Sequence, residues 1–153
     1  MKKQISFIVA TILITLFIFN NSLKTADVSG SESAFFSDLL SSLLIKLNLS
    51  EYGYLSTVLV RKAAHIFEFF VHAVMLAGCF TLKYRKRIVY ILFFGLLTAC
   101  VDEYIQYFID GRGSMVQDIF VDFAGTILGM AAGRLIYTLK NKQHQNHSHN
   151  LKS

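Results

Sequence analysis

The chain has no proline and no tryptophan, and it has two cysteines among its 153 residues. The absence of proline excludes the proline-containing motifs of the familiar membrane lipid phosphatases. Cys79 and Cys100 both lie inside long apolar segments, so we interpret them as small apolar fillers and not as a disulfide. The GxSxG nucleophile elbow, the Gly-rich phosphate loop that ends in Lys-Ser/Thr and the HExxH motif are also missing. An enzyme built from this chain would therefore need other side chains for its chemistry.

Apolar residues make up 54% of the chain and are concentrated in four blocks. Each block spans, or nearly spans, about 30 Å of hydrocarbon at about 1.5 Å per helical residue. The first block is followed by no small-residue cleavage pattern, so we interpret it as an uncleaved anchor. We expect an all-α integral membrane bundle in a single domain, 1–139, followed by a polar cytoplasmic tail, 140–153. Its four transmembrane helices are predicted at residues 5–20, 63–82, 88–108 and 118–139.

The basic residues predict the orientation, because Lys and Arg that flank a span tend to stay on the cytoplasmic side. With the N-terminus inside, all ten acidic residues fall on the outer half, and both termini are cytoplasmic. The formal net charge of +5 is then a topology signal and gives no support to nucleic-acid binding. Ten of the fifteen basic residues lie inside: Lys2, Lys3, Lys83, Arg85, Lys86, Arg87, Arg134, Lys140, Lys142 and Lys152.

Eight polar or ionisable side chains lie in or at one end of the apolar blocks. A charge at the centre of a spanning helix costs about 2.5–3.5 kcal/mol, so residues of this kind mark candidate functional sites. On the predicted topology all eight fall in the outer leaflet. They are Arg61, His65, Glu68, Asp102, Glu103, Gln106, Asp118 and Asp122.

Helical spacing predicts which way these side chains face, because residues three or four apart share one stripe. Stripes of this polarity are costly against lipid, so we expect the acidic groups to point into the bundle. The small residues on the last stripe predict a close helix interface. The stripes are Arg61, His65, Glu68 and His72; Gly95, Ala99, Asp102 and Gln106; and Asp118, Asp122, Gly125, Gly129 and Gly133.

One interpretation of these polar residues is structural: the cations neutralise the carboxylates, the ion pairs fix the helix register, and the residues bind no ligand. Three permanent cations, Arg61, Lys62 and Arg112, face five carboxylates. The carboxylates are those of Glu68, Asp102, Glu103, Asp118 and Asp122. Some carboxylates are therefore protonated, or a metal ion or a cationic ligand completes the balance. His65 and Glu68, with Asp118 and Asp122 on a facing helix, have the spacing of metal ligands. This spacing is common on helices, so the metal and the cofactor stay undecided.

The segment between the first two blocks contains an amphipathic helix at about residues 33–48. One interpretation is a helix that lies in the outer membrane interface and roofs the polar site. The other is a strut that packs its apolar side against the bundle. The stripe consists of Phe35, Phe36, Leu39, Leu40, Leu43, Leu44 and Leu47.

Two motifs, at residues 61–68 and 102–106, and the polar and glycine residues that follow them resemble the VanZ-like family of small bacterial membrane proteins. The resemblance implies a helical protein of the bacterial cytoplasmic membrane, in a family named for a member associated with teicoplanin resistance and with no well-established reaction. Family members often have Pro before the Gly-Arg pair, where this chain has Asp110. The matching residues are Arg61-Lys62-Ala63-Ala64-His65-Ile66-Phe67-Glu68, Asp102-Glu103-Tyr104-Ile105-Gln106, Gly111-Arg112, Asp118, Asp122 and 125–129.

We expect the outer site to recognise or modify a lipid-linked cell-envelope component, such as a peptidoglycan precursor, and so to affect glycopeptide susceptibility. The expected partners are membrane lipids and this precursor, with no nucleic acid. The alternative is a non-enzymatic membrane protein whose cluster is structural or binds a protein partner, so enzyme activity stays open, as does the oligomeric state. The expected ligand-binding residues are Arg61, Lys62, Gln106 and Arg112, and the expected catalytic residues are His65, Glu68, Asp102, Glu103, Asp118 and Asp122.

Overall fold

The structure is a computed structural model that describes residues 2–47, 56–80 and 84–150. These residues form five helices and no strand, so the all-α class is confirmed for the described part of the chain. Residue 48 of the predicted amphipathic helix, residues 81–82 of the predicted second span and residues 151–153 of the tail lie outside the described residues. The helices are α1 (Lys2–Ser22), α2 (Ala26–Lys46), α3 (Ser56–Cys79), α4 (Tyr84–Gln106) and α5 (Val116–Asn150).

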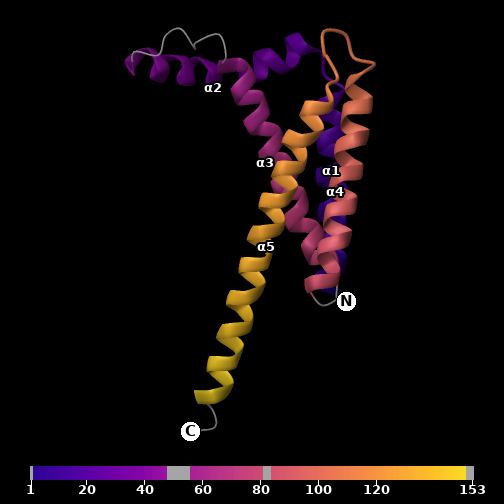
Figure 1. Cartoon of the computed structure of the whole chain (residues 1–153), viewed down its shortest axis with the longest axis vertical. Helices are drawn as coiled ribbons and strands as arrows, with labels where there is room; N and C mark the ends of the chain where they lie inside the picture. Colours follow the sequence, from indigo (N-terminus) through magenta and orange to yellow (C-terminus); the bar gives the residue numbers. More distant parts are fainter. Residues whose placement is uncertain (1, 48–55, 81–83, 151–153) are drawn as a thin grey trace.

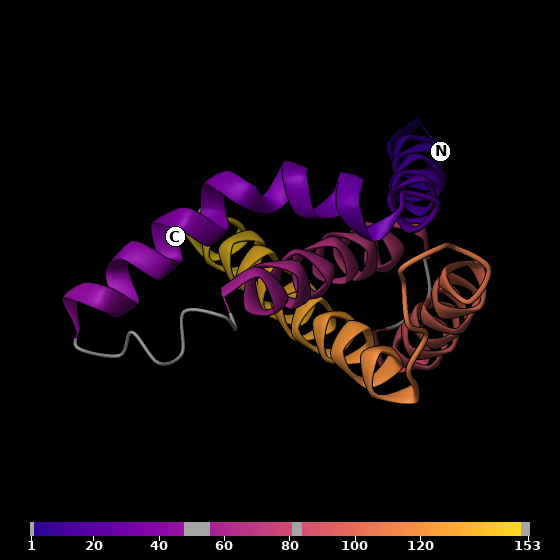
Figure 2. The ribbon, with the colours of Figure 1, turned by 90° about the horizontal axis from the view of Figure 1, so that it is seen from above.

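Helices α1, α3, α4 and α5 stand together as a bundle, and α2 lies across one end of it (Figure 1). Seen from above, α3 runs through the middle, and it packs against each of the other four helices, most extensively against α5 (Figure 2). Both chain termini lie toward the end opposite α2 (Figure 1). The end with α2 and the α4–α5 loop, residues 107–115, is called the α2 end below.

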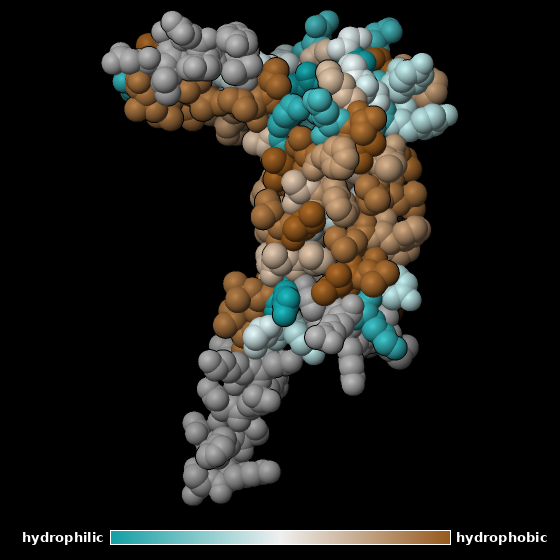
Figure 3. All heavy atoms as spheres, in the orientation of Figure 1, coloured by the Kyte–Doolittle hydropathy of each residue, from teal (hydrophilic) through white to brown (hydrophobic). Residues whose placement is uncertain are grey.

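Three helices are long and apolar enough to cross a membrane: Lys2–Ser22, Lys86–Gln106 and Val116–Leu139. Apolar side chains cover the middle of the bundle, and polar side chains gather at the α2 end (Figure 3). This arrangement is that of a multi-pass membrane protein. Helix α5 continues to Asn150, past the predicted end of its span at residue 139.

The prediction of four helices that are each apolar enough to cross a membrane is wrong for the helix predicted at residues 63–82. Arg61 and Lys62 precede the apolar part of α3, Glu68 interrupts it, and the helix ends at Cys79. Among the described residues, α3 therefore lacks the run of about 20 apolar residues that a helix surrounded by lipid needs. It lies at the centre of the bundle, where it packs against each of the other four helices.

Helix α2 leaves most of its apolar stripe uncovered. Phe35, Leu39 and Leu43 are 72%, 60% and 53% exposed. The contact with α3 uses small polar side chains: Ser37 is buried, and the Ser41 hydroxyl donates to Ser56 Oγ at 2.8 Å. The part of α2 that projects from the bundle shows a hydrophobic surface in Figure 3. This packing favours the membrane-interface interpretation of the helix over the packing strut.

A single tryptophan tests the placement of α2, because the natural chain has none. In lipid vesicles, Leu43→Trp is expected to give blue-shifted fluorescence that brominated lipids quench, since the indole would lie at the acyl-chain boundary. Asp38→Trp is the control on the other side of α2, and its emission should be quenched less. Equal quenching of both variants, or a water-like spectrum for Leu43→Trp, would contradict the interfacial placement.

The glycine stripe of α5 packs directly onto α3, as the sequence predicts. A Cβ added to Gly125 would collide with the Ile66 carbonyl oxygen, and one added to Gly129 would collide with the Phe70 carbonyl oxygen. At Gly133 the added Cβ would lie 3.2 Å from Ala77 Cβ. The two backbones can approach this closely only without side chains between them. The same contact sets the polar stripe of α5 opposite that of α3.

Candidate functional site

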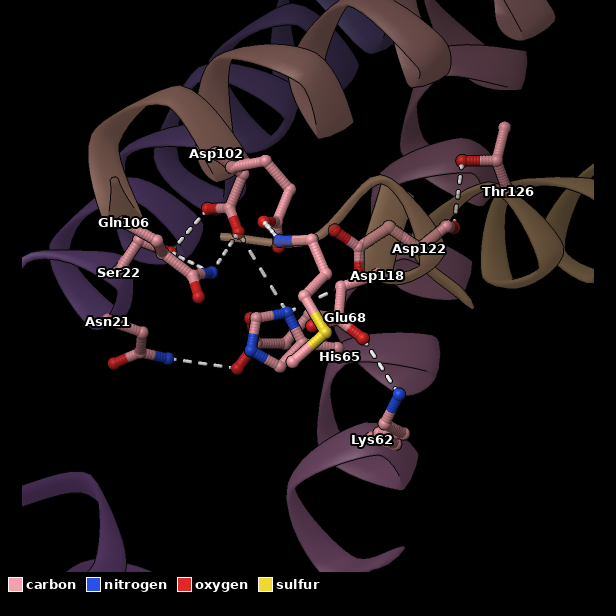
Figure 4. Close-up of polar contacts among 12 residues, drawn as sticks. Asn21, Ser22, Lys62, His65, Glu68, Asp102, Gln106, Asp118, Asp122 and Thr126 are labelled. Carbon is pink, nitrogen blue, oxygen red and sulfur yellow. Dashed lines mark hydrogen bonds and ion pairs between the residues drawn. The ribbon is translucent and has the colours of Figure 1, made fainter. Parts of the chain in front are cut away.

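Three helices bring one histidine and two aspartates together near the α2 end: His65 from α3, Asp102 from α4 and Asp122 from α5 (Figure 4). His65 Nδ1 lies 3.3 Å from Asp122 Oδ1 and 3.9 Å from Asp102 Oδ2. The Asp102 and Asp122 side chains are 0% and 1% exposed, and the His65 side chain is 20% exposed. We call these three residues the His–Asp cluster. Its members face the bundle interior, as the stripes predict.

Both oxygens of Asp102 are held by neighbouring side chains. The Ser22 hydroxyl donates to Oδ1, and Gln106 Nε2 donates to Oδ2 at 2.7 Å. The same Gln106 nitrogen lies 3.3 Å from Ser22 Oγ. Side chains of α1 and α4 together therefore orient the Asp102 carboxylate. Gln106, which the sequence predicts to bind a ligand, hydrogen-bonds Asp102 in this structure.

Glu68 belongs to the same region but has a different partner. Asn21 Nδ2 donates to Glu68 Oε1 at 2.9 Å, while Glu68 Oε2 is buried with no hydrogen-bond partner. The Asn21 carbonyl oxygen in turn accepts a hydrogen bond from Arg112 Nη2 at 3.1 Å. Asn21 thus connects the carboxylate of α3 to the arginine of the α4–α5 loop.

Asn21 and Ser22 are site residues that the sequence reasoning missed. They stand at the end of the first apolar block, among the residues that show no signal-peptide cleavage pattern. Their signal was their position, because polar residues at the outer end of a span lie at nearly the same depth as the predicted cluster. Depth counting extended to the first span would have included them.

Glu103 and Asp118 lie beside the cluster and make other contacts. The backbone N–H of Met115 donates to Glu103 Oε2 at 3.0 Å, which ties the loop before α5 to the end of α4. Lys62 Nζ donates to Asp118 Oδ1 at 2.7 Å, in a pair whose side chains are 40% and 28% exposed. The structure therefore gives these two predicted catalytic residues positions at the margin of the site.

The α4–α5 loop turns at Gly111, whose φ of +74° is the left-handed conformation that glycine adopts most easily. A Cβ at this position would lie 3.2 Å from the Ala26 side chain. The Arg112 N–H donates to the Ile109 carbonyl oxygen at 3.1 Å. The chain thus forms this turn with Asp110 directly before the Gly-Arg pair.

Two cavities meet at this site. The larger, of about 330 Å³, lies between α3, the α4–α5 loop and α5, and the smaller, of about 210 Å³, lies between α1, α2 and α3. Arg61, His65 and Arg112 line both cavities. The larger cavity is also lined by Lys62, Glu103, Gln106, Asp118 and Asp122.

The three permanent cations do not simply neutralise the carboxylates. Within the described part of the chain, Lys62 pairs with Asp118, but Arg61 and Arg112 make no ion pair within 4.0 Å. Arg112 Nε and Nη1 are buried without a hydrogen-bond partner. Burial and the nearby Arg61 charge lower the pKa of Arg112, although a guanidinium stays cationic in proteins. Two arginines are therefore available to an anion.

His72 shares the predicted stripe but lies outside the site. It is 2% exposed, its ring lies 6.3 Å from the ring of Phe69, and it lines neither cavity. Its Nδ1 is buried without a hydrogen-bond partner. The part of the α3 stripe that reaches the candidate site therefore ends at Glu68.

Comparison with known proteins identifies the family of this chain. A family model described as VanZ/LLP1 matches residues 7–139, most of the chain. The matched range contains every site residue described above. No curated protein and no solved structure matches the chain significantly.

Proposed function

The chain belongs to the VanZ/LLP1 family, and on that premise we propose that it binds the anionic head group of a lipid-linked cell-envelope component at the α2 end. A peptidoglycan precursor carried on a phosphorylated lipid is such a component. The proposal includes residence in the bacterial cytoplasmic membrane with both termini in the cytoplasm, because basic residues flank the end of the bundle that carries the two termini. It requires α3 to cross the membrane inside the bundle, beside the three apolar helices. The site then opens toward the outer surface.

The observation that carries the proposal is the state of the two arginines. Arg112 buries two guanidinium nitrogens that have no partner, and Arg61 lies beside it on the wall that the two cavities share. Leaving a buried donor unsatisfied costs about 1–3 kcal/mol, more for a charged group, which a bound anion would recover. Phosphate oxygens match the guanidinium donors in charge and geometry.

The surroundings of the site favour a ligand attached to lipid. Helix α2 lies across the same end of the bundle with its apolar stripe exposed, and Phe36 of α2 lines the smaller cavity. A head group between these walls would have its acyl chains beside an apolar surface. Lys62, which is paired with Asp118 at the rim of the larger cavity, would contribute a further positive charge.

Chemical modification of the bound component is part of the same proposal. His65 lines both cavities and is oriented by Asp122, an arrangement in which an imidazole can take or give a proton. Asp102 Oδ2 lies 3.9 Å from the same imidazole, Glu68 lines the smaller cavity with it, and Glu103 and Asp118 line the larger cavity with it. Altered precursor chemistry or access would change susceptibility to a glycopeptide such as teicoplanin.

The test is the affinity of purified, detergent-solubilised protein for a lipid-linked peptidoglycan precursor. Arg112→Gln removes a charge-assisted contact worth about 1.5–3 kcal/mol, so its Kd is expected to rise by about 10- to 150-fold. Arg134→Gln, an exposed arginine near the other end of the bundle, is the matched control and should bind like the native protein.

Two results would contradict the proposal. One is equal affinity of the native protein and Arg112→Gln while both keep their helical circular dichroism. The other is equal affinity of the native protein for the precursor and for a neutral lipid with the same acyl chains. Either result would leave a structural cluster or a protein-binding role as the function of this surface.

A further inference from the structure

We propose that the His–Asp cluster is a binding site for one divalent first-row transition-metal ion, with His65, Asp102 and Asp122 as the protein ligands. The inference goes beyond head-group binding and does not depend on it. It stands on the geometry of three side chains, on their charge and on a buried oxygen atom that has no partner.

The geometry suits a single ion. His65 Nδ1 and one carboxylate oxygen from each aspartate all lie within 4.8 Å of one another. The histidine nitrogen is 3.3 Å from one of these oxygens and 3.9 Å from the other. Ligands at about 2.1 Å from a tetrahedral ion lie roughly 3.4 Å apart, so an ion can sit between these atoms with small side-chain shifts.

The charge of the cluster calls for a cation. Among the described residues, His65 is the only ion-pair partner of either aspartate, and both carboxylates are almost completely buried. A buried charge without compensation costs several kcal/mol, and one imidazole supplies at most a single positive charge. A divalent ion would balance both carboxylates and leave the imidazole neutral, as a metal ligand must be.

A second observation points to a ligand at this position. Asp122 is 1% exposed, yet its Oδ2 has no hydrogen-bond partner, and the residue lines the larger cavity. The carboxylates of Asp102 and Asp122 both point toward the His65 ring (Figure 4). Buried acceptors are normally satisfied, so an orphan oxygen here indicates a missing partner.

The surroundings have the second layer of contacts that metal sites use. Ser22 and Gln106 orient Asp102, as outer partners orient a ligating carboxylate. His65 and Asp122 line the larger cavity, so coordination positions of the ion would remain open toward it. One imidazole and two carboxylates suit first-row divalent ions such as Zn²⁺ and Mn²⁺ better than Ca²⁺, which prefers oxygen ligands alone.

Metal binding by the full-length protein tests the inference. His144, His147 and His149 of the C-terminal tail are changed to Gln first, because they could capture metal independently. After treatment with a chelator, titration with Zn²⁺ or Mn²⁺ is expected to give one ion per chain. Asp102→Asn and Asp122→Asn should each weaken the Kd by more than about 10-fold, since even the loss of an outer partner costs 10- to 100-fold.

Asp38→Asn is the matched control, because it makes the same change at an exposed aspartate of α2 that lines neither cavity. It should bind metal like the unchanged chain. Bound Co²⁺ supplies a second readout: its visible absorption spectrum should change in His65→Gln. If one aspartate variant fails to fold, the other and His65→Gln carry the same test.

Three outcomes would overturn the metal site: no binding by the folded chain, equal binding by all the aspartate variants, or a Co²⁺ spectrum unchanged in His65→Gln. Head-group binding is measured separately in the presence of chelator. A loss of affinity in Arg112→Gln under that condition would uphold the proposed function even if the metal site fails. The two proposals can therefore fail independently.

Discussion

Gly129→Val is expected to destabilise the protein by about 3 kcal/mol, because α5 and α3 touch through backbone at this position. A Cβ at Gly129 would collide with the Phe70 carbonyl oxygen and would lie 2.9 Å from Ala73 Cβ. Neither neighbour is the end of a flexible side chain, so the helices must move apart. Overpacking of this kind costs about 1–3 kcal/mol, and a β-branched side chain against backbone belongs at the upper limit.

The measurement is unfolding by SDS in mixed micelles, followed by circular dichroism. Two controls give a graded series on the same helix: Gly133→Ala, whose Cβ would lie 3.2 Å from Ala77 Cβ, and Ala131→Val at an exposed position. We expect a small effect for the first and almost none for the second. If Gly129→Val proves as stable as Ala131→Val, the close α3–α5 contact is wrong.

Asp102→Asn is expected to stabilise the protein by about 1–4 kcal/mol when the measurement is made in chelator. The change removes one of two buried carboxylates that share one imidazole. An asparagine can keep the contacts of Ser22 and Gln106, because its oxygen accepts from Gln106 and its amide donates to the serine hydroxyl. The second carboxylate beside a single imidazole carries a desolvation penalty of several kcal/mol without a cation of its own, and a neutral amide removes that penalty while His65 keeps Asp122.

The same unfolding assay checks this sign. Asp118→Asn is the control, and it should change stability by less than about 1 kcal/mol, since its pair with Lys62 is partly exposed. A clear loss of stability in Asp102→Asn would instead support the structural interpretation, in which the cluster fixes helix register. With the metal ion bound, the native protein should be more stable than Asp102→Asn, because the native protein alone would keep all three ligands.

The expected effect of Asp102→Asn and the two proposals share one physical argument about buried charge. Residues kept for stability are normally paired and satisfied, whereas this site keeps unpartnered atoms on Glu68, Arg112 and Asp122. Such an arrangement costs stability in the isolated protein and is recovered when a ligand binds. The direct ion pair between Lys62 and Asp118 shows that this fold can place a cation beside a carboxylate. The unpartnered atoms are therefore not a general property of the fold.

The sequence alone predicted much of the local structure. Apolar runs and helical spacing located all five helices, and the stripe spacing turned His65, Asp102 and Asp122 inward and placed the glycines of α5 at an interface. These predictions succeed because they depend on local properties, namely hydropathy and the period of the α-helix. The family resemblance rests on the same residues, and the family match supports it.

The predicted fourth span shows where local reasoning fails. Counting apolar residues treats every helix as if lipid surrounded it, but α3 is surrounded by other helices and can carry Arg61, Lys62 and Glu68. Whether a helix faces lipid or protein depends on its neighbours, which periodicity does not describe. Helix α2 is the opposite case, because its apolar stripe could have packed against the bundle. Only the structure shows that its serine side contacts α3 and that the apolar side stays exposed.

The partners within the site were decided by tertiary structure alone. Ser22 meets Asp102 across 80 positions of the chain, and Arg112 meets the Asn21 carbonyl across 91. A stripe predicts the face of a helix but not the residue that it meets, because that choice depends on how the helices cross and on the turn at Gly111. The sequence thus determined which side chains enter the bundle, and packing decided which of them are paired, which are left without partners and where the cavities lie.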